Sequence, residues 1–259
     1  VYDDLVFYFK YASSAYSALG CARPNGNTLV STISSLLTDT QGFIVRDDNR
    51  KEIVVVFRGS SSATDFLTDA SILLTSFTSS GVNAPFGTLV HSGFLGGWNS
   101  VASSVISTVR SQLAANPTYT IITSGHSLGG KYTLTLSSIA GVALKQNFPN
   151  SNLRLYTYGQ PRVGNRAYAT FVNNQVGVSN IFRGVHTLDG VPTIIPTYLG
   201  YAHHATEFWS TLDPTSAATT RQCNTSGEDL TCSGAIISGG INAPHLSYYN
   251  ILASTTFCT

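Results

Sequence analysis

A serine between two glycines is the first feature of this sequence that suggests chemistry. Residues 125–129 read GHSLG, with Ser127 at the centre, and they lie between an apolar stretch typical of a buried strand and a stretch of helical character. Such a strand–turn–helix presents the serine hydroxyl at a sharp turn, and the glycines leave room for neighbouring backbone. The N-terminus of the following helix favours negative charge nearby. We therefore predict a nucleophilic Ser127; the alternative is an ordinary glycine-rich turn.

A nucleophilic serine needs a base and an acid. Where a serine occupies a turn of this kind, the acid and then the histidine follow it along the chain. Asp189 is the best-placed acid, because it follows an apolar strand that ends near Val185 and precedes a Gly-Val-Pro turn. That position predicts a loop at the carboxyl edge of the sheet, where α/β folds gather their sites. Asp213 and Asp229 lie in turn-rich sequence, and we expect both to be solvated.

The base is predicted to be His245. This histidine follows Pro244 in a loop near the C-terminus, whereas His186 precedes Asp189 and breaks the expected order. In the predicted set, His245 takes the proton of Ser127, and Asp189 orients the imidazole. The neighbouring His203 and His204 could suggest a metal pair, but adjacent side chains on a strand point to opposite faces. We expect no metal and no cofactor.

Ester or amide chemistry at a serine also requires donors for an oxyanion. One donor is predicted to be the backbone N–H of Leu128, the residue after the nucleophile. A second is predicted in the segment that leaves the apolar strand 52–57, where Ser60 offers both an N–H and a hydroxyl. The alternative is that the serines of this segment only form a tight turn.

The elements around these residues alternate between strand and helix. Such alternation predicts an α/β fold with a mainly parallel sheet and helices on its faces. We predict helices over 3–19, 101–114 and 128–148, strands over 52–57, 119–123, 154–158 and 181–185, and an irregular tail over 213–240.

Composition excludes several classes of function. Only 10% of the 259 residues are charged, against about 25% in typical soluble proteins, and the net charge is +1. Without a basic patch, nucleic acid is a poor candidate for a partner. The longest strongly apolar run, 53–57, is too short to cross a bilayer.

The four cysteines and the first residue favour a secreted protein. The chain begins at Val1 without a visible signal peptide, as a mature secreted chain does. Three disulfide pairings are possible. We favour Cys21 with Cys258, which ties the two ends together, and Cys223 with Cys232, which closes a short loop; the alternative is four free thiols. A sequon at Asn224 lies inside that loop and predicts a glycosylation site.

Several motifs together resemble those of the fungal class 3 lipases, a family of triacylglycerol lipases and related feruloyl esterases. They follow in the family's order: FRGSSS at 57–62, VHSGF at 90–94, the serine motif, YTYGQPRVGN at 156–165, DGVP at 189–192 and HLSYY at 245–249. The resemblance covers nearly the whole chain. It implies one α/β-hydrolase domain over 1–259, with a mainly parallel central sheet and helices on both faces.

The resemblance also assigns supporting roles. It implies that Ser60 is an oxyanion residue whose hydroxyl Asp69 orients, that Tyr16 packs near the nucleophile and that His203 is structural. It supports both disulfides. It further implies a short lid around residues 61–69 that offers Phe66 and Leu67. The family's feruloyl esterases place tyrosines in the cleft where this chain has Ile72 and Phe94, so we expect an apolar pocket.

These observations predict a secreted serine hydrolase that cleaves carboxylic esters, with acylglycerols as the favoured substrates and a transient contact with a lipid interface. One alternative is a feruloyl-type esterase acting on plant cell-wall hydroxycinnamate esters. Another is a non-catalytic hydrolase fold that serves as a binding module, but such a module has no need of a nucleophile, a base and an acid together.

Overall fold

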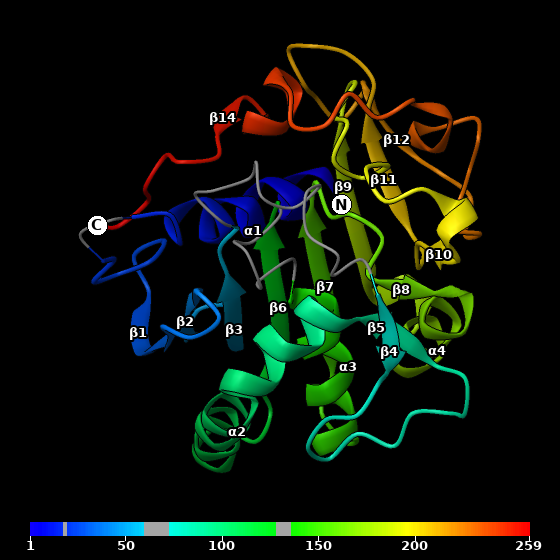
Figure 1. Ribbon diagram of the computed structural model, residues 1–259. Helices are drawn as coiled ribbons and strands as arrows, with labels where there is room; N and C mark the ends of the chain where they lie inside the picture. The colour runs from blue at the N-terminus through cyan, green and yellow to red at the C-terminus, as the bar shows by residue number, and fades with distance from the viewer. Residues whose placement is uncertain (18–19, 60–72, 128–135) are drawn as a thin grey trace.

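An eight-stranded sheet forms the centre of the molecule (Figure 1). The computed structural model describes residues 1–17, 20–59, 73–127 and 136–259. The strands of the sheet, in spatial order, are β1 (Thr28–Ser35), β2 (Thr40–Asp47), β3 (Glu52–Phe57), β6 (Thr120–His126), β7 (Leu153–Tyr158), β9 (Ile181–His186), β11 (Glu207–Ser210) and β12 (Thr220–Gln222).

The middle of this sheet is parallel and its margins are antiparallel. Neighbouring strands run parallel from β3 through β6, β7 and β9 to β11, whereas β1, β2 and β12 are joined antiparallel. Parallel strands end at one common edge, where ligand sites of such folds gather. The predicted mainly parallel sheet is confirmed.

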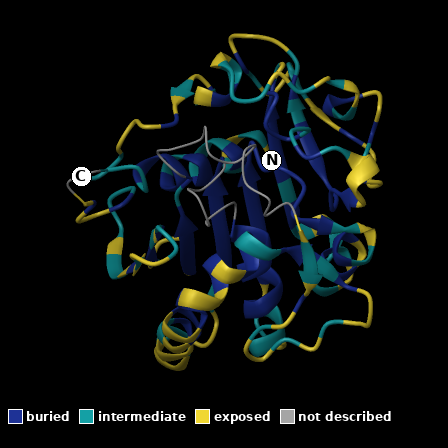
Figure 2. Cartoon of the chain, in the orientation of Figure 1, coloured by how far each residue is buried: buried dark blue, intermediate teal, exposed yellow. Residues whose placement is uncertain are grey.

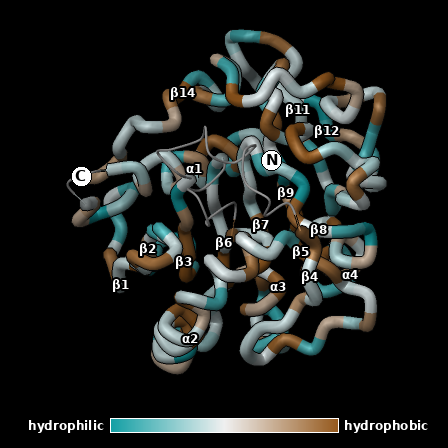
Figure 3. Tube along the Cα trace, in the orientation of Figure 1, coloured by the Kyte–Doolittle hydropathy of each residue, from teal (hydrophilic) through white to brown (hydrophobic). Residues whose placement is uncertain are grey.

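Helices cover both faces of the sheet. They are α1 (Tyr2–Ser14), α2 (Ser92–Ala115), α3 (Ser137–Asn147) and α4 (Arg166–Val176). Strand β3 shows how the layers form: Val54 and Val56 pack into a core with α1, and Val55 packs into the core that contains residues of the other three helices. Figure 2 shows buried residues along the central strands, and Figure 3 shows hydrophobic residues on the same strands.

Smaller elements surround the central layers. A four-stranded sheet joins β10 (Tyr201–Ala202), β8 (Gly164–Asn165), β5 (Leu89–His91) and β4 (Leu74–Ser76), and β13 (Ser247–Tyr248) pairs with β14 (Ile251–Leu252). Short 3₁₀ helices span Val178–Asn180, Thr197–Leu199, Ser233–Ala235 and Ala243–Leu246. Among the residues that the structure describes, no helix is both long and apolar enough to cross a membrane.

Several predicted boundaries were wrong. The first helix ends at Ser14 rather than at residue 19. Helix α2 begins at Ser92, before the predicted residue 101, because the His91 side chain accepts a hydrogen bond from the Gly93 N–H and caps it. The predicted start of the helix 128–148 lies outside the described residues, and within them α3 spans Ser137–Asn147. The β1–β2 hairpin and α4 were not predicted.

Two disulfide bonds have the favoured pairing. Cys21 is bonded to Cys258, which fixes the segment after α1 to the C-terminus. Cys223 is bonded to Cys232 and closes a loop beside β12. Cross-links of this kind stabilise the fold mainly by restricting the unfolded chain.

Four of the buried histidines in the described residues favour the neutral form. Burial lowers the pKa of His91 and of His204 to about 4 and that of His126 to about 3. Burial also lowers the pKa of His203, well below its ordinary value. The adjacent His203 and His204 make structural hydrogen bonds to the backbone. The His203 Nε2–H donates to the Pro192 carbonyl at 2.8 Å, and the His204 Nδ1–H donates to the Ala205 carbonyl at 2.8 Å.

These histidines predict that the fold loses stability in mild acid. Below about pH 6.5 the histidines of the unfolded chain bind protons, whereas the same histidines stay neutral in the native fold. The free energy of unfolding therefore falls by up to about 1.4 kcal/mol per pH unit for each of the four histidines. Burial raises the pKa of Glu52, which offsets part of this loss. Urea unfolding at pH 7 and pH 5 should show a decrease of several kcal/mol. Equal or greater stability at pH 5 would contradict the prediction.

Candidate active site

Ser127 lies directly after β6 in a strained turn. Its φ of +69° is in the left-handed region, which costs energy for a residue with a side chain. Its N–H donates to the Tyr158 carbonyl at 2.8 Å and fixes the turn against β7. A Cβ at Gly125 would lie 2.3 Å from the Ser137 Oγ, so the glycine allows α3 to approach the end of the strand. The turn therefore has the local geometry predicted from the glycine spacing.

The three predicted chemical residues meet in the fold. The Ser127 Oγ is hydrogen-bonded to the His245 Nε2. The His245 Nδ1–H donates to the Asp189 carboxylate, at 2.9 Å to Oδ2 and 3.1 Å to Oδ1. Ser127 comes from the end of β6, Asp189 from the loop after β9, and His245 from a 3₁₀ helix near the C-terminus. All three are buried.

Hydrogen bonds keep Asp189 ionised although it is fully buried. Burial by itself would raise its pKa, but bonds from the His245 imidazole, the Tyr248 hydroxyl and the Val191 N–H outweigh burial and lower the pKa below its ordinary value. An ionised Asp189 holds the proton of His245 on Nδ1. The Nε2 lone pair then faces the serine hydroxyl, as a base requires.

Gly159 makes room for the acid and the base. It follows β7 with a φ of +58°, and a Cβ at this position would lie 2.8 Å from the His245 Cε1 and 2.9 Å from the Asp189 Oδ2. Any larger residue would press on both members of the pair. This glycine lies in the segment 156–165, but no sequence signal distinguished its role from that of a turn glycine.

A chain of hydrogen bonds between uncharged groups reaches the backbone carbonyl of His245. The Gly59 N–H donates to the Tyr16 hydroxyl at 2.9 Å, and that hydroxyl lies 3.0 Å from the His126 Nδ1. The His126 Nε2–H then donates to the His245 carbonyl at 3.0 Å. Burial keeps His126 neutral by lowering its pKa to about 3, which permits this alternation of donor and acceptor. Tyr16 thus lies near Ser127, as expected, and His126 has a supporting contact that sequence reasoning missed.

Several predicted site residues lie outside the residues that the structure describes. They are Ser60, Phe66, Leu67, Asp69, Ile72 and Leu128, together with the whole predicted lid. Other predicted residues are described but lie outside this cluster. Phe94 is fully buried in the first turn of α2, with its ring stacked on His91 at a centroid distance of 3.9 Å. Asn224 is exposed in the disulfide loop.

In the described chain, one cluster has metal-ligand spacing, but two of its members, Cys223 and Cys232, are bonded to each other.

Comparison with known proteins relates this arrangement to lipases. Residues 54–199 match the family Lipase (class 3). A secreted alkaline triacylglycerol lipase from Penicillium cyclopium is 34% identical over 99% of this chain and 87% of its own length. A Rhizopus niveus lipase is 36% identical over 88% of this chain, which spans only 55% of that longer protein. The crystal structure of a triacylglycerol lipase from Penicillium expansum superposes with a TM-score of 0.89 at 32% identity, covering 100% of this chain and 96% of that one.

Replacing Gly159 should damage the site more than the fold. In Gly159→Ala, the new methyl group displaces the imidazole and the carboxylate, and a misplacement of about 1 Å can cost on the order of 100-fold in rate. We expect kcat on a soluble aryl ester to fall by about that factor while far-ultraviolet circular dichroism stays unchanged. Full activity in this variant would show that the close packing around Gly159 does not position the pair.

Proposed function

The chain belongs to the class 3 lipase family and is a carboxylic ester hydrolase, and from this premise we propose that it cleaves acylglycerols through an acyl-enzyme on Ser127. The observation that carries the proposal is the continuous hydrogen-bond chain from Ser127 through His245 to Asp189. A buried serine, imidazole and carboxylate in this order are the components of nucleophilic acyl transfer.

The proposed reaction follows from these contacts. The Ser127 Oγ attacks the ester carbonyl carbon while the His245 Nε2 takes its proton, and Asp189 stabilises the imidazolium that forms. His245 then gives the proton to the leaving alcohol, and an acyl-serine remains. A water molecule, deprotonated by the same imidazole, attacks the acyl carbon and releases the free acid and the serine.

The oxyanion donors remain as predicted from the sequence, the N–H of Leu128 and the N–H and hydroxyl of Ser60. The N–H of Gly59, next to Ser60, donates to the Tyr16 hydroxyl instead. Tyr16 therefore connects the end of the segment that would carry Ser60 with His126, and through it with His245. This connection supports a fixed relation between the proposed oxyanion loop and the base, which electrostatic stabilisation of a transition state requires.

Apolar side chains beside the acid and the base support a lipid substrate. Leu188, directly before Asp189, is 64% exposed, and Leu246, directly after His245, is 55% exposed. An exposed apolar patch favours contact with an apolar ligand or interface. We therefore propose that Leu188 and Leu246 form such a patch, which contacts acyl chains and, transiently, a lipid surface.

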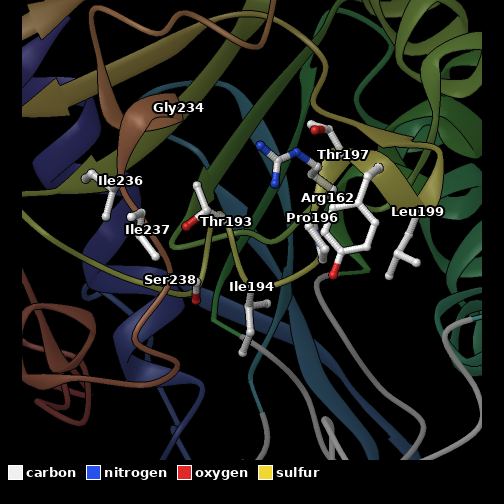
Figure 4. A pocket seen from close by; sticks show the side chains of 11 residues that line it. Arg162, Thr193, Ile194, Pro196, Thr197, Leu199, Gly234, Ile236, Ile237 and Ser238 are labelled. Atoms are coloured by element: carbon white, nitrogen blue, oxygen red, sulfur yellow. The ribbon is translucent and has the colours of Figure 1, made fainter.

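A pocket of about 510 Å³ lies beside the segment that follows Asp189, with Thr193 and Ile194 in its lining (Figure 4). Leu199 and Ile237 also contribute to its lining, and the Ser238 hydroxyl donates to the carbonyl of Gly190, the residue after Asp189, at 2.5 Å. One wall of the pocket is thereby tied to the loop of the acid. We propose that it accommodates an apolar part of the substrate.

Secretion is part of the same proposal. The relative from Penicillium cyclopium is named as secreted, and two disulfides are typical of an oxidising compartment. We also propose that Asn224 carries a glycan, because its side chain is exposed within the disulfide loop.

A comparison of three substrates tests the proposal. Emulsified triglyceride, a soluble short-chain ester and methyl ferulate are offered at equal enzyme concentration, with Ser127→Ala as the blank. We expect the emulsion to be turned over fastest and the blank to lose at least about 10⁴-fold in rate. An active blank would overturn the role of Ser127, and preference for methyl ferulate would reassign the substrate to hydroxycinnamate esters.

A further inference from the structure

His186 lies at the carboxyl end of β9, outside the set of three residues proposed to react. It is buried, with 3% of its surface exposed, and both of its ring nitrogens face oxygen atoms. The Nδ1 lies 2.8 Å from the Pro244 carbonyl oxygen, and the Nε2 lies 2.8 Å from the Asp213 Oδ1. Its order in the chain excluded it as the base, and the mechanism above does not use it.

The position of His186 connects it with both loops that carry the acid and the base. Its own carbonyl accepts a hydrogen bond from the Asp189 N–H at 2.8 Å. Its side chain contacts Pro244, the residue immediately before His245. One residue thus joins the start of the acid loop to the start of the base segment, and any movement of its ring is passed to the backbone beside His245.

The two hydrogen bonds of this ring have different consequences. A carbonyl and a carboxylate can only accept, so each bond needs a proton on the ring nitrogen that faces it. The bond from Nδ1 reaches the segment of the base, whereas the bond from Nε2 holds the ring against Asp213. A side chain that keeps one of these donors and lacks the other therefore separates the two contacts.

The other groups around the ring do not replace Asp213. From β13, the Tyr248 ring lies 5.6 Å from the His186 ring, and its hydroxyl donates to the Asp189 carboxylate. That carboxylate is occupied by His245, Tyr248 and the Val191 N–H. From β11, the Trp209 indole donates to the Thr187 carbonyl and carries no charge. Among the described residues that contact this ring, Asp213 is the one acid.

We propose that His186 is a positioning residue for the ester hydrolysis, and that it fixes the backbone before His245 through the hydrogen bond from its Nδ1 to the Pro244 carbonyl. Asp213 holds the other nitrogen of the ring. The proposal rests on the proposed function, because it assumes that His245 is the base.

Three variants separate the two hydrogen bonds. The amide nitrogen of His186→Asn can take the place of Nδ1 and donate to Pro244, while that of His186→Gln can take the place of Nε2 and donate to Asp213. Asp213→Asn removes the charge, and its amide can donate to a neutral ring that keeps its proton on Nδ1. The Asp213 side chain is 64% exposed, so this variant should fold normally.

The experiment is a measurement of kcat and KM on a soluble ester for each enzyme. We expect His186→Gln, which lacks the donor to Pro244, to lose at least about tenfold in kcat, with KM unchanged. His186→Asn, which keeps that donor, should recover most of this loss, and Asp213→Asn should lose much less than His186→Gln. Asp48→Asn is the matched control, because Asp48 is an acid with a 53% exposed side chain that pairs with Arg46. It should keep the natural kcat.

Two results would overturn the proposal. One is a loss of kcat in Asp213→Asn as large as that in His186→Gln, which would assign the effect to the contact with Asp213. The other is an equal loss of kcat in His186→Asn and His186→Gln, which would indicate a packing role without a specific bond to Pro244. Urea unfolding of each variant identifies any loss that comes from a failed fold. Ser127→Ala is measured in parallel, so that failure of the proposed function is recognised separately by activity in that variant.

Discussion

The left-handed turn at Ser127 is the constraint on which the site depends. A side-chain-bearing residue at a φ of +69° is costly, and the surrounding structure must compensate for it. The compensation is visible in the N–H bond to the Tyr158 carbonyl and in the space that Gly125 leaves for Ser137 of α3. Both contacts come from the neighbouring parallel strand and helix. The α/β layers therefore place the Ser127 hydroxyl at the edge of the sheet, where the segments that carry Asp189 and His245 also lie.

His245, the proposed base, is held from several directions by hydrogen bonds. Asp189 is ionised and orients the imidazole of His245. His126 is kept neutral by burial and donates to the His245 carbonyl. In the proposed account, His186 fixes the preceding residue, Pro244. Each contact reaches a different atom of the segment, so the ring is restrained although it belongs to a short 3₁₀ helix. Preorganisation of this kind reduces the rearrangement that the reaction requires.

Much of this arrangement could be predicted from the sequence, because its signals are local. The glycine spacing around Ser127 and the buried strand 52–57 depend on neighbours in the chain, and the order of acid and histidine limited the search to few residues. The β1–β2 hairpin was missed because β1 is partly exposed and has no strong apolar pattern. The roles of Gly159, Tyr248 and His186 could not be predicted, since they arise where loops distant in sequence pack together.

The most direct test of the central claim is covalent labelling with a phosphonate ester that reacts with an activated serine. The account predicts one phosphonyl group per chain, located on Ser127 by mass spectrometry, and labelling slower by about 100-fold or more in His245→Ala, because the hydroxyl then lacks its base. Labelling at another residue, or equal rates in the two proteins, would contradict the claim that the turn at Ser127 presents a nucleophile to His245.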